Sequence, residues 1–251
     1  MRNLAKVAAA IFTMVVIYML LFPSAGSGPV APSSSCRHRL KNIWLALENY
    51  HTDHGSYPPA YVTDSNGNPL YSWRVLLLPY LDQRPAYTEF DLSKAWDAPE
   101  NEKVSDISFF DFRCPNMPAE RSNESTTNYL AVIGPDCAWS GSKPMTKSDL
   151  GNDLSNVILL VEVADTHTPW AKPEDFVLSE MADGINTSDT DGISSYHCRD
   201  WTYTFKHGKP GANVLFADGH GKYLDSSFGE RELRGMLTIS GSATSESENN
   251  R

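Results

Sequence analysis

The chain has 251 residues, of which 31 are acidic and 21 basic, so its formal net charge is −10 at pH 7. This balance argues against nucleic acid as a partner, because a phosphate backbone attracts a basic surface. Apolar residues make up 41% of the sequence, which is enough for a globular core. They are unevenly spread, since 18 of the first 22 residues are apolar.

The apolar N-terminal segment does not belong to the globular fold. Arg2 and Lys6 precede an uncharged run from Val7 to Phe22. Extended to residues 4–22, this run is just long enough to cross a bilayer as one helix. The two positive charges favour the cytoplasm, so everything after the run is expected to be exported.

The N-terminal segment leaves two locations open. We favour a retained anchor, which gives a single-pass protein of the cytoplasmic membrane with an extracytoplasmic C-terminal domain, because the run is longer and more apolar than a signal needs. The alternative is a cleaved signal peptide and a secreted or periplasmic protein, since the small residues Ser24-Ala25-Gly26 follow the run. Residues 23–35 are rich in Pro, Ser, Gly and Ala and predict a flexible tether.

Export would place the four cysteines in an oxidising compartment. An even number of cysteines there predicts up to two disulfides, with three pairings that spacing alone cannot separate. The alternative is one disulfide or none, with the other thiols as small buried apolar groups. The cysteines concerned are Cys36, Cys114, Cys137 and Cys198.

An amphipathic helix is predicted from Arg37 to His51. Leu40, Ile43 and Leu47 recur at steps of three and four, which places them on one face. Gly55 is a typical stop signal after such a helix.

The middle of the chain predicts short elements. Turn-forming residues from Asp64 to Pro69 predict an irregular hairpin, and Ser72 could cap a short helix from Trp73 to Leu81. Three runs are strand-like, and the last, rich in β-branched residues and Leu, is expected to be central in a sheet. These runs are Phe109 to Arg113, Asn128 to Ile133 and Asn156 to Val163.

The C-terminal part predicts a hairpin and a closing helix. Ala212 to Ala217 and Lys222 to Leu224 are apolar runs joined by Asp218-Gly219-His220-Gly221, a strong hairpin cue. Glu230 to Leu237 predicts a short helix.

The order of elements predicts an α+β fold, in which the amphipathic helix packs on a mainly antiparallel β-sheet. The expected parts are an anchor or signal segment, the tether, one α+β domain and a disordered tail. They cover residues 1–22, 23–35, 36–239 and 240–251.

An apolar segment, an amphipathic helix and a sheet follow one another as in type IV pilins and type II secretion pseudopilins. The stretch from Ala46 to Pro58, which ends in Asp-His-Gly-Ser-Tyr-Pro, resembles the pseudopilin pattern. More specifically, several ordered blocks resemble the planctomycete prepilin-type family known as domain of unknown function 1559 (DUF1559). The blocks are Cys36 to His51, Ser72 to Leu81, Ala95 to Asn101, Phe112 to Pro115, Pro169 to Asp175 and Ala212 to Gly219.

Two features depart from the family pattern. The family's prepilin signal, Gly followed by Phe-Thr-Leu-Val-Glu, is missing, which puts processing by a prepilin peptidase in doubt. The family's C-terminal motif separates a His from Asp-Gly by nine residues, whereas ten separate His207 from Asp218-Gly219 here. The family has no established activity, so the resemblance implies architecture and location better than function.

Two groups of residues could hold a metal. His197, His207, Asp218 and His220 offer ligands suited to zinc, although turn formation and backbone hydrogen bonding would explain them as well. An acidic loop offers oxygen ligands for calcium, but its spacing does not fit an EF-hand, and a solvated loop is the alternative. The loop residues are Asp183, Asn186, Asp189 and Asp191.

No nucleophile elbow, phosphate loop or comparable catalytic motif is present in the sequence. The leading hypothesis is therefore a non-catalytic, membrane-anchored, pilin-like assembly or interaction module, with protein partners of a secretion or pilus-like system and the membrane contacted through residues 4–22. The first alternative is a secreted ligand- or glycan-binding module with a calcium-stabilised loop. The second is a metal-dependent hydrolase that uses the C-terminal His/Asp group.

Overall fold

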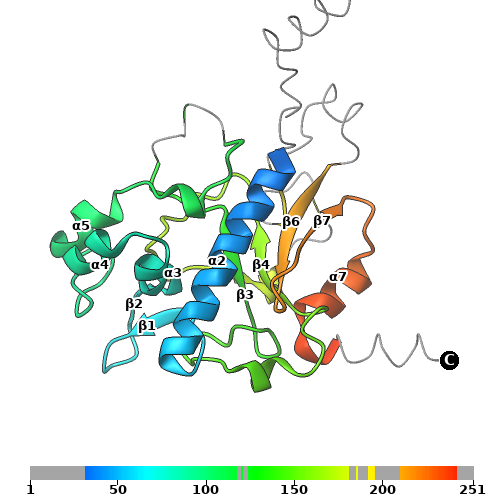
Figure 1. The fold of residues 1–251 in the computed structure, drawn as a ribbon, viewed down its shortest axis with the longest axis horizontal. Coiled ribbons are helices and arrows are strands. Elements are labelled where there is room, and N and C mark those ends of the chain that lie inside the picture. The colour runs from blue at the N-terminus through cyan, green and yellow to red at the C-terminus, as the bar shows by residue number, and fades with distance from the viewer. Residues whose placement is uncertain are drawn as a thin grey trace, which may run out of the picture. The chain divides into compact units, whose positions relative to one another are not determined.

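The computed structural model describes residues 32–117, 120, 124–180, 185, 192–195 and 210–241 (Figure 1). The chain divides into two compact units, Met1–Ala31 and Pro32–Arg251, and all described residues belong to the second. The predicted anchor, most of the tether and the end of the tail lie outside the described residues. None of the described helices has the length and apolar character needed to cross a membrane.

The helix α2 (Pro32–His54) opens the described fold and confirms the predicted amphipathic helix. Its stripe of Leu40, Ile43 and Leu47 is fully buried. The helix ends where Gly55 adopts a φ of +76°, a left-handed conformation that favours glycine. The sequence pattern thus predicted the buried face and the stop. The helix starts five residues earlier than expected, so residues 32–35, which were assigned to the tether, belong to α2.

The sheet has five strands in the order β5-β3-β4-β6-β7. All neighbouring pairs are antiparallel except β3 and β5, which are parallel. The α+β class, the mainly antiparallel sheet and the central place of the third predicted strand are therefore confirmed. The strands are β3 (Tyr129–Ile133), β4 (Ile158–Glu162), β5 (Phe176–Val177), β6 (Gly211–Phe216) and β7 (Gly221–Asp225).

Helices cover both faces of this sheet. Because successive side chains of a strand point to opposite faces, Tyr129 and Ala131 belong to one apolar cluster with α2, whereas Leu130 and Val132 belong to a second. The second cluster includes Leu233 and other residues of α7 (Glu230–Leu237), as predicted for the closing helix. The burial of both faces explains why β4 is apolar from Ile158 to Val161 rather than alternating.

Shorter elements complete the described fold. The expected irregular hairpin is β1 (Tyr61–Thr63) with β2 (Pro69–Ser72), and Ser72 caps α3 (Trp73–Leu77) by accepting a hydrogen bond from the Arg74 backbone N–H. Several short elements were not predicted, because each has fewer residues than a periodic pattern needs. They include α4 (Arg84–Glu89), α5 (Pro99–Ser105) and β5, and the 3₁₀ helices η4 (Lys147–Leu150) and η5 (Leu178–Glu180). The 3₁₀ helix η1 (Leu78–Tyr80) follows α3 directly and lies inside the helix predicted from Trp73 to Leu81.

The predicted strand from Phe109 to Arg113 is wrong, because this segment forms the 3₁₀ helix η2 (Phe110–Phe112). Its backbone closes turns, with the Phe112 N–H donating to the Phe109 carbonyl and the Arg113 N–H to the Phe110 carbonyl. Phe109 and Phe112 are buried while Phe110 is 59% exposed. The aromatic run suggested a strand, but its two buried aromatic positions, Phe109 and Phe112, are three residues apart and thus have the spacing of a turn of helix.

Replacing Phe112 by Ala should lower the free energy of unfolding by about 3–5 kcal/mol, because the ring is fully buried beside Trp170, with ring centroids 6.0 Å apart. The matched control is Phe110→Ala in the same turn. Since Phe110 is mostly exposed, that change should cost less than about 1 kcal/mol. Urea unfolding measures both values, and equal losses would contradict the assignment of Phe110 to the surface.

Candidate functional site

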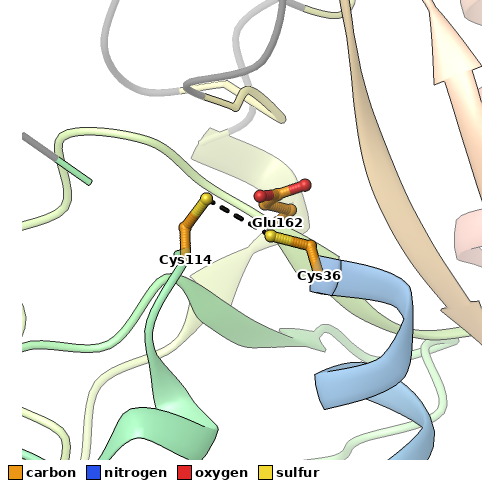
Figure 2. Close-up of side chains that lie close together, drawn as sticks. All are labelled: Cys36, Cys114 and Glu162. Carbon is orange, nitrogen blue, oxygen red and sulfur yellow. Dashed lines mark hydrogen bonds between the residues drawn. The ribbon is translucent and has the colours of Figure 1, made fainter. Parts of the chain in front are cut away.

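Two thiols and a carboxylate meet in the interior beside the first turns of α2 (Figure 2). Cys36 comes from α2, Cys114 from the segment after η2, and Glu162 from the end of β4. The two Sγ atoms are 3.2 Å apart and in hydrogen-bond contact, and one ligand atom from each of the three residues lies within 4.8 Å of the others. Three segments distant in sequence therefore build one cluster, called here the thiol–carboxylate cluster.

Each member of the thiol–carboxylate cluster is positioned by its own segment. Cys36 lies one helical turn before Leu40, on the buried face of α2. The Cys114 N–H donates to Asn128 Oδ1 at 2.8 Å, which fixes the segment after η2 against β3. Glu162 Oε2 accepts hydrogen bonds from the Asn213 backbone N–H at 3.0 Å and from its Nδ2 at 2.7 Å.

The cluster is closed to solvent and the Cys114 thiol is protonated at neutral pH. Cys36 and Glu162 are fully buried and Cys114 is 2% exposed. Burial, followed by the hydrogen bond with Cys36 and the charge of Glu162, raises the pKa of Cys114 well above its ordinary value. A buried, protonated thiol is a poor nucleophile. The chemistry open to these groups is therefore cross-linking, or ligation of a thiophilic ion such as Zn²⁺.

The structure brings together two of the four cysteines singled out in the sequence. Cys137 is buried in the second apolar cluster, on the face of the sheet that α7 covers. Cys198 lies outside the described residues. No disulfide joins the cysteines that the structure describes. Spacing alone left three possible pairings of the four cysteines. The fold favours the pairing of Cys36 with Cys114, because it places these two side by side.

The predicted C-terminal metal group is described only in part. His197 and His207 lie outside the described residues. Asp218 and His220 lie in the turn between β6 and β7, where His220 Nδ1 is 2.6 Å from Asp218 Oδ1 and the imidazole stacks on Phe216. The zinc site remains a prediction, as does the calcium loop, whose residues Asp183, Asn186, Asp189 and Asp191 also lie outside the described part.

The Asp218-Gly219 motif packs against α2. Gly219 adopts a φ of +84°, and a Cβ placed there would lie 2.3 Å from the Trp44 ring. The Gly219 carbonyl accepts a hydrogen bond from Lys41 Nζ at 3.1 Å, and the Ala217 carbonyl accepts one from Trp44 Nε1 at 3.3 Å. In the described structure this motif therefore fastens the hairpin to the helix.

One buried ion pair was not predicted from the sequence. Arg74 of α3 and Asp175, just before β5, are buried, with Arg74 Nη2 2.5 Å from Asp175 Oδ1. Asp175 also accepts hydrogen bonds from Trp73 Nε1 and from the Ala131 N–H, and Arg74 donates to the Tyr129 carbonyl at 2.7 Å. Burial raises the pKa of Asp175 and lowers that of Arg74, each against the attraction of its partner.

One signal could have pointed to both missed groups. Arg74 lies within the apolar run from Trp73 to Leu78, and Glu162 ends the apolar run of β4. A charged residue inside such a run must either face solvent or find a partner in the core. Which partner it finds is decided by tertiary contacts, so Asp175 and the two thiols could not be named in advance.

Fold and cluster together define the class as an α+β protein with a helix across a mainly antiparallel sheet and a buried thiol–carboxylate cluster. The family model described as protein of unknown function (DUF1559) matches residues 31–158, just over half of the chain, and the chain belongs to this family. Cys36, Arg74 and Cys114 fall inside the matched range. No curated protein and no solved structure matches the chain.

Replacing Gly219 by Ala should lower the free energy of unfolding by at least about 2 kcal/mol, because the methyl group meets Trp44 and the residue must hold a positive φ. Gly67→Ala is the matched control, since Gly67 has a φ of +85° but open space around it. It should cost about 1 kcal/mol, from the backbone alone. Thermal or urea unfolding gives the difference, and equal costs would contradict the contact with Trp44.

Replacing Asp175 by Asn should cost about 3–5 kcal/mol, because the Arg74 guanidinium would stay buried without its counter-charge. The control is Glu89→Gln. This change removes an exposed ion pair with Lys103, at 3.4 Å, and should cost less than about 1 kcal/mol. Urea unfolding compares the two, and a small loss for Asp175→Asn would show that the buried pair is dispensable.

Proposed function

We propose that this protein is a membrane-anchored, extracytoplasmic module of pilin- or pseudopilin-like architecture that serves assembly or interaction rather than catalysis. One observation carries the proposal. An uncharged apolar run, preceded by Arg2 and Lys6, is joined by a short Pro, Ser, Gly and Ala-rich stretch to α2, the first element of an α+β domain. An anchor followed by a helix that packs on an antiparallel sheet is the order that the pilin resemblance implies.

The packing of α2 supports this architecture. The helix crosses one face of the sheet in Figure 1. Its buried stripe belongs to the same apolar cluster as Tyr129 and Ala131, while Leu45 on the opposite side of the helix is 47% exposed. A helix used in this way is part of the core of its own domain and still offers a surface to a neighbour. That combination suits a protein that is held at a membrane and contacts other proteins.

Exposed apolar side chains support an interaction role. Leu45 and Phe110 are 47% and 59% exposed and line one surface depression of about 560 Å³ together with Tyr80, Leu81 and five polar or charged residues. Large apolar side chains that lie close together on a surface are typical of sites of protein contact, whereas single exposed apolar residues are common everywhere. The acidic excess adds solubility and excludes nucleic acid as the favoured partner.

Mapping the membrane topology of the protein in a Gram-negative host tests the proposed location. The full chain should stay in the membrane fraction after an alkaline carbonate wash, and protease added outside spheroplasts should digest residues 36–239. A variant that lacks residues 4–22 should be soluble and protected from the protease, because it has lost the apolar run.

Sequencing the N-terminus of the mature protein separates the two locations. A start at Met1 agrees with a retained anchor. A start near Ser27, with the protein in the soluble periplasmic fraction, would contradict the anchor. Protection of the full-length domain from external protease would contradict export as a whole.

A further inference from the structure

The two thiols of the thiol–carboxylate cluster are placed for a covalent bond. Cys36 Sγ and Cys114 Sγ are 3.2 Å apart, and the residues are 78 positions apart in the sequence. A disulfide needs about 2.05 Å between its sulfurs, so an approach of about 1 Å completes it. Two thiolates on one tetrahedral zinc ion would lie about 3.8 Å apart, so the observed separation falls between the two arrangements, and zinc is an outcome that the experiment below distinguishes.

We propose that Cys36 and Cys114 form a disulfide that clasps the first turns of α2 to the segment after η2. The pairing rests on the geometry of the cluster. Its formation in the cell rests on the proposed function, because an extracytoplasmic compartment is oxidising. The other contacts of the same two segments agree with a fixed junction, since Arg39 of α2 donates a hydrogen bond to the Arg113 carbonyl, next to Cys114.

The proposed disulfide lies where the chain enters the domain from the expected anchor. Cys36 is the fifth residue of α2, and the expected anchor and the first part of the expected tether, residues 23–31, precede this helix. Helix ends fray more readily than helix centres. A cross-link at this position holds the first turns of α2 on the domain when the tether moves or is pulled, and it also restricts the unfolded chain.

The oxidation needs a disulfide-bearing oxidant, such as a small-molecule disulfide or an oxidised oxidoreductase. One cysteine thiolate attacks the oxidant, forms a mixed disulfide and releases one thiol of the oxidant. The second thiolate then attacks the cysteine sulfur of the mixed disulfide and releases the other oxidant thiol. Two protons and two electrons leave the cysteine pair, and the oxidant is reduced to two thiols.

The timing of this step follows from burial. In the folded, reduced protein the pKa of the Cys114 thiol is raised by burial, by its hydrogen bond with Cys36 and by the charge of Glu162, so little thiolate is present. The bond therefore forms while the chain folds and the thiols still meet solvent. Glu162 needs no rearrangement for it, because its Oε2 is held by the backbone N–H and the Nδ2 of Asn213.

The pairing is tested by refolding the full chain. The protein is purified in mild detergent, unfolded with reductant, and refolded in a mixture of oxidised and reduced glutathione. Remaining thiols are alkylated, and the protein is digested without reductant. Trypsin, which cleaves after Arg113 and Arg121, releases Cys114 in the peptide 114–121. Mass spectrometry should find this peptide joined to the peptide that contains Cys36.

Three results would overturn the proposal. They are recovery of Cys36 and Cys114 as alkylated thiols, linkage of either to Cys137 or Cys198, and stoichiometric zinc bound with both thiols reduced. Because the refolding uses no cell compartment, none of these results depends on where the protein resides. The location is tested separately by the protease and N-terminal experiments.

Thermal unfolding provides a second readout. Reductant should lower the melting temperature of the oxidised protein by about 5–15 °C, because it removes a cross-link between distant positions. The double variant Cys36→Ser, Cys114→Ser should melt near the reduced protein and show no further shift with reductant. Cys137→Ala is the matched control and should keep the full shift, whereas loss of the shift in this control would overturn the pairing.

Discussion

Leu40, Ile43 and Leu47 lie on one side of α2 and are fully buried against the face of the sheet that carries Tyr129 and Ala131. The rest of the fold depends on this contact, because an amphipathic helix and a sheet each need a partner to cover their apolar face. The same contact places Trp44 over Gly219 and Cys36 beside Cys114. The hairpin motif and the thiol pair are thus consequences of where α2 lies.

Two buried polar clusters fix the positions of chain segments relative to one another, which apolar contacts define less specifically. The thiol–carboxylate cluster joins α2, the segment after η2 and β4. The Arg74–Asp175 pair joins α3 to the start of β5 and also binds the backbone of β3. Buried charges are costly unless every group finds a partner, so these contacts hold only in one arrangement of the chain. The contacts therefore favour that arrangement over one in which a charge is buried alone.

Local signals in the sequence predicted the long helix, the β1–β2 and β6–β7 hairpins, the central strand and α7, because periodicity and turn residues act over a few positions. They failed from Phe109 to Arg113, where an aromatic run forms a 3₁₀ turn. They also could not identify pairs such as Arg74 with Asp175, which lie 101 positions apart. The cysteines show the same limit, since spacing left three pairings and only the fold places Cys36 beside Cys114.

The central claim is that α2 belongs to the core of the domain, with its apolar stripe held on the sheet. Native-state hydrogen exchange of the full chain tests this most directly. The account predicts that backbone amides near Ile43 and Leu47 exchange only through global unfolding, as slowly as those of β4. Exchange at these α2 positions many times faster than in β4 would show that the helix opens independently of the sheet, which would contradict the account.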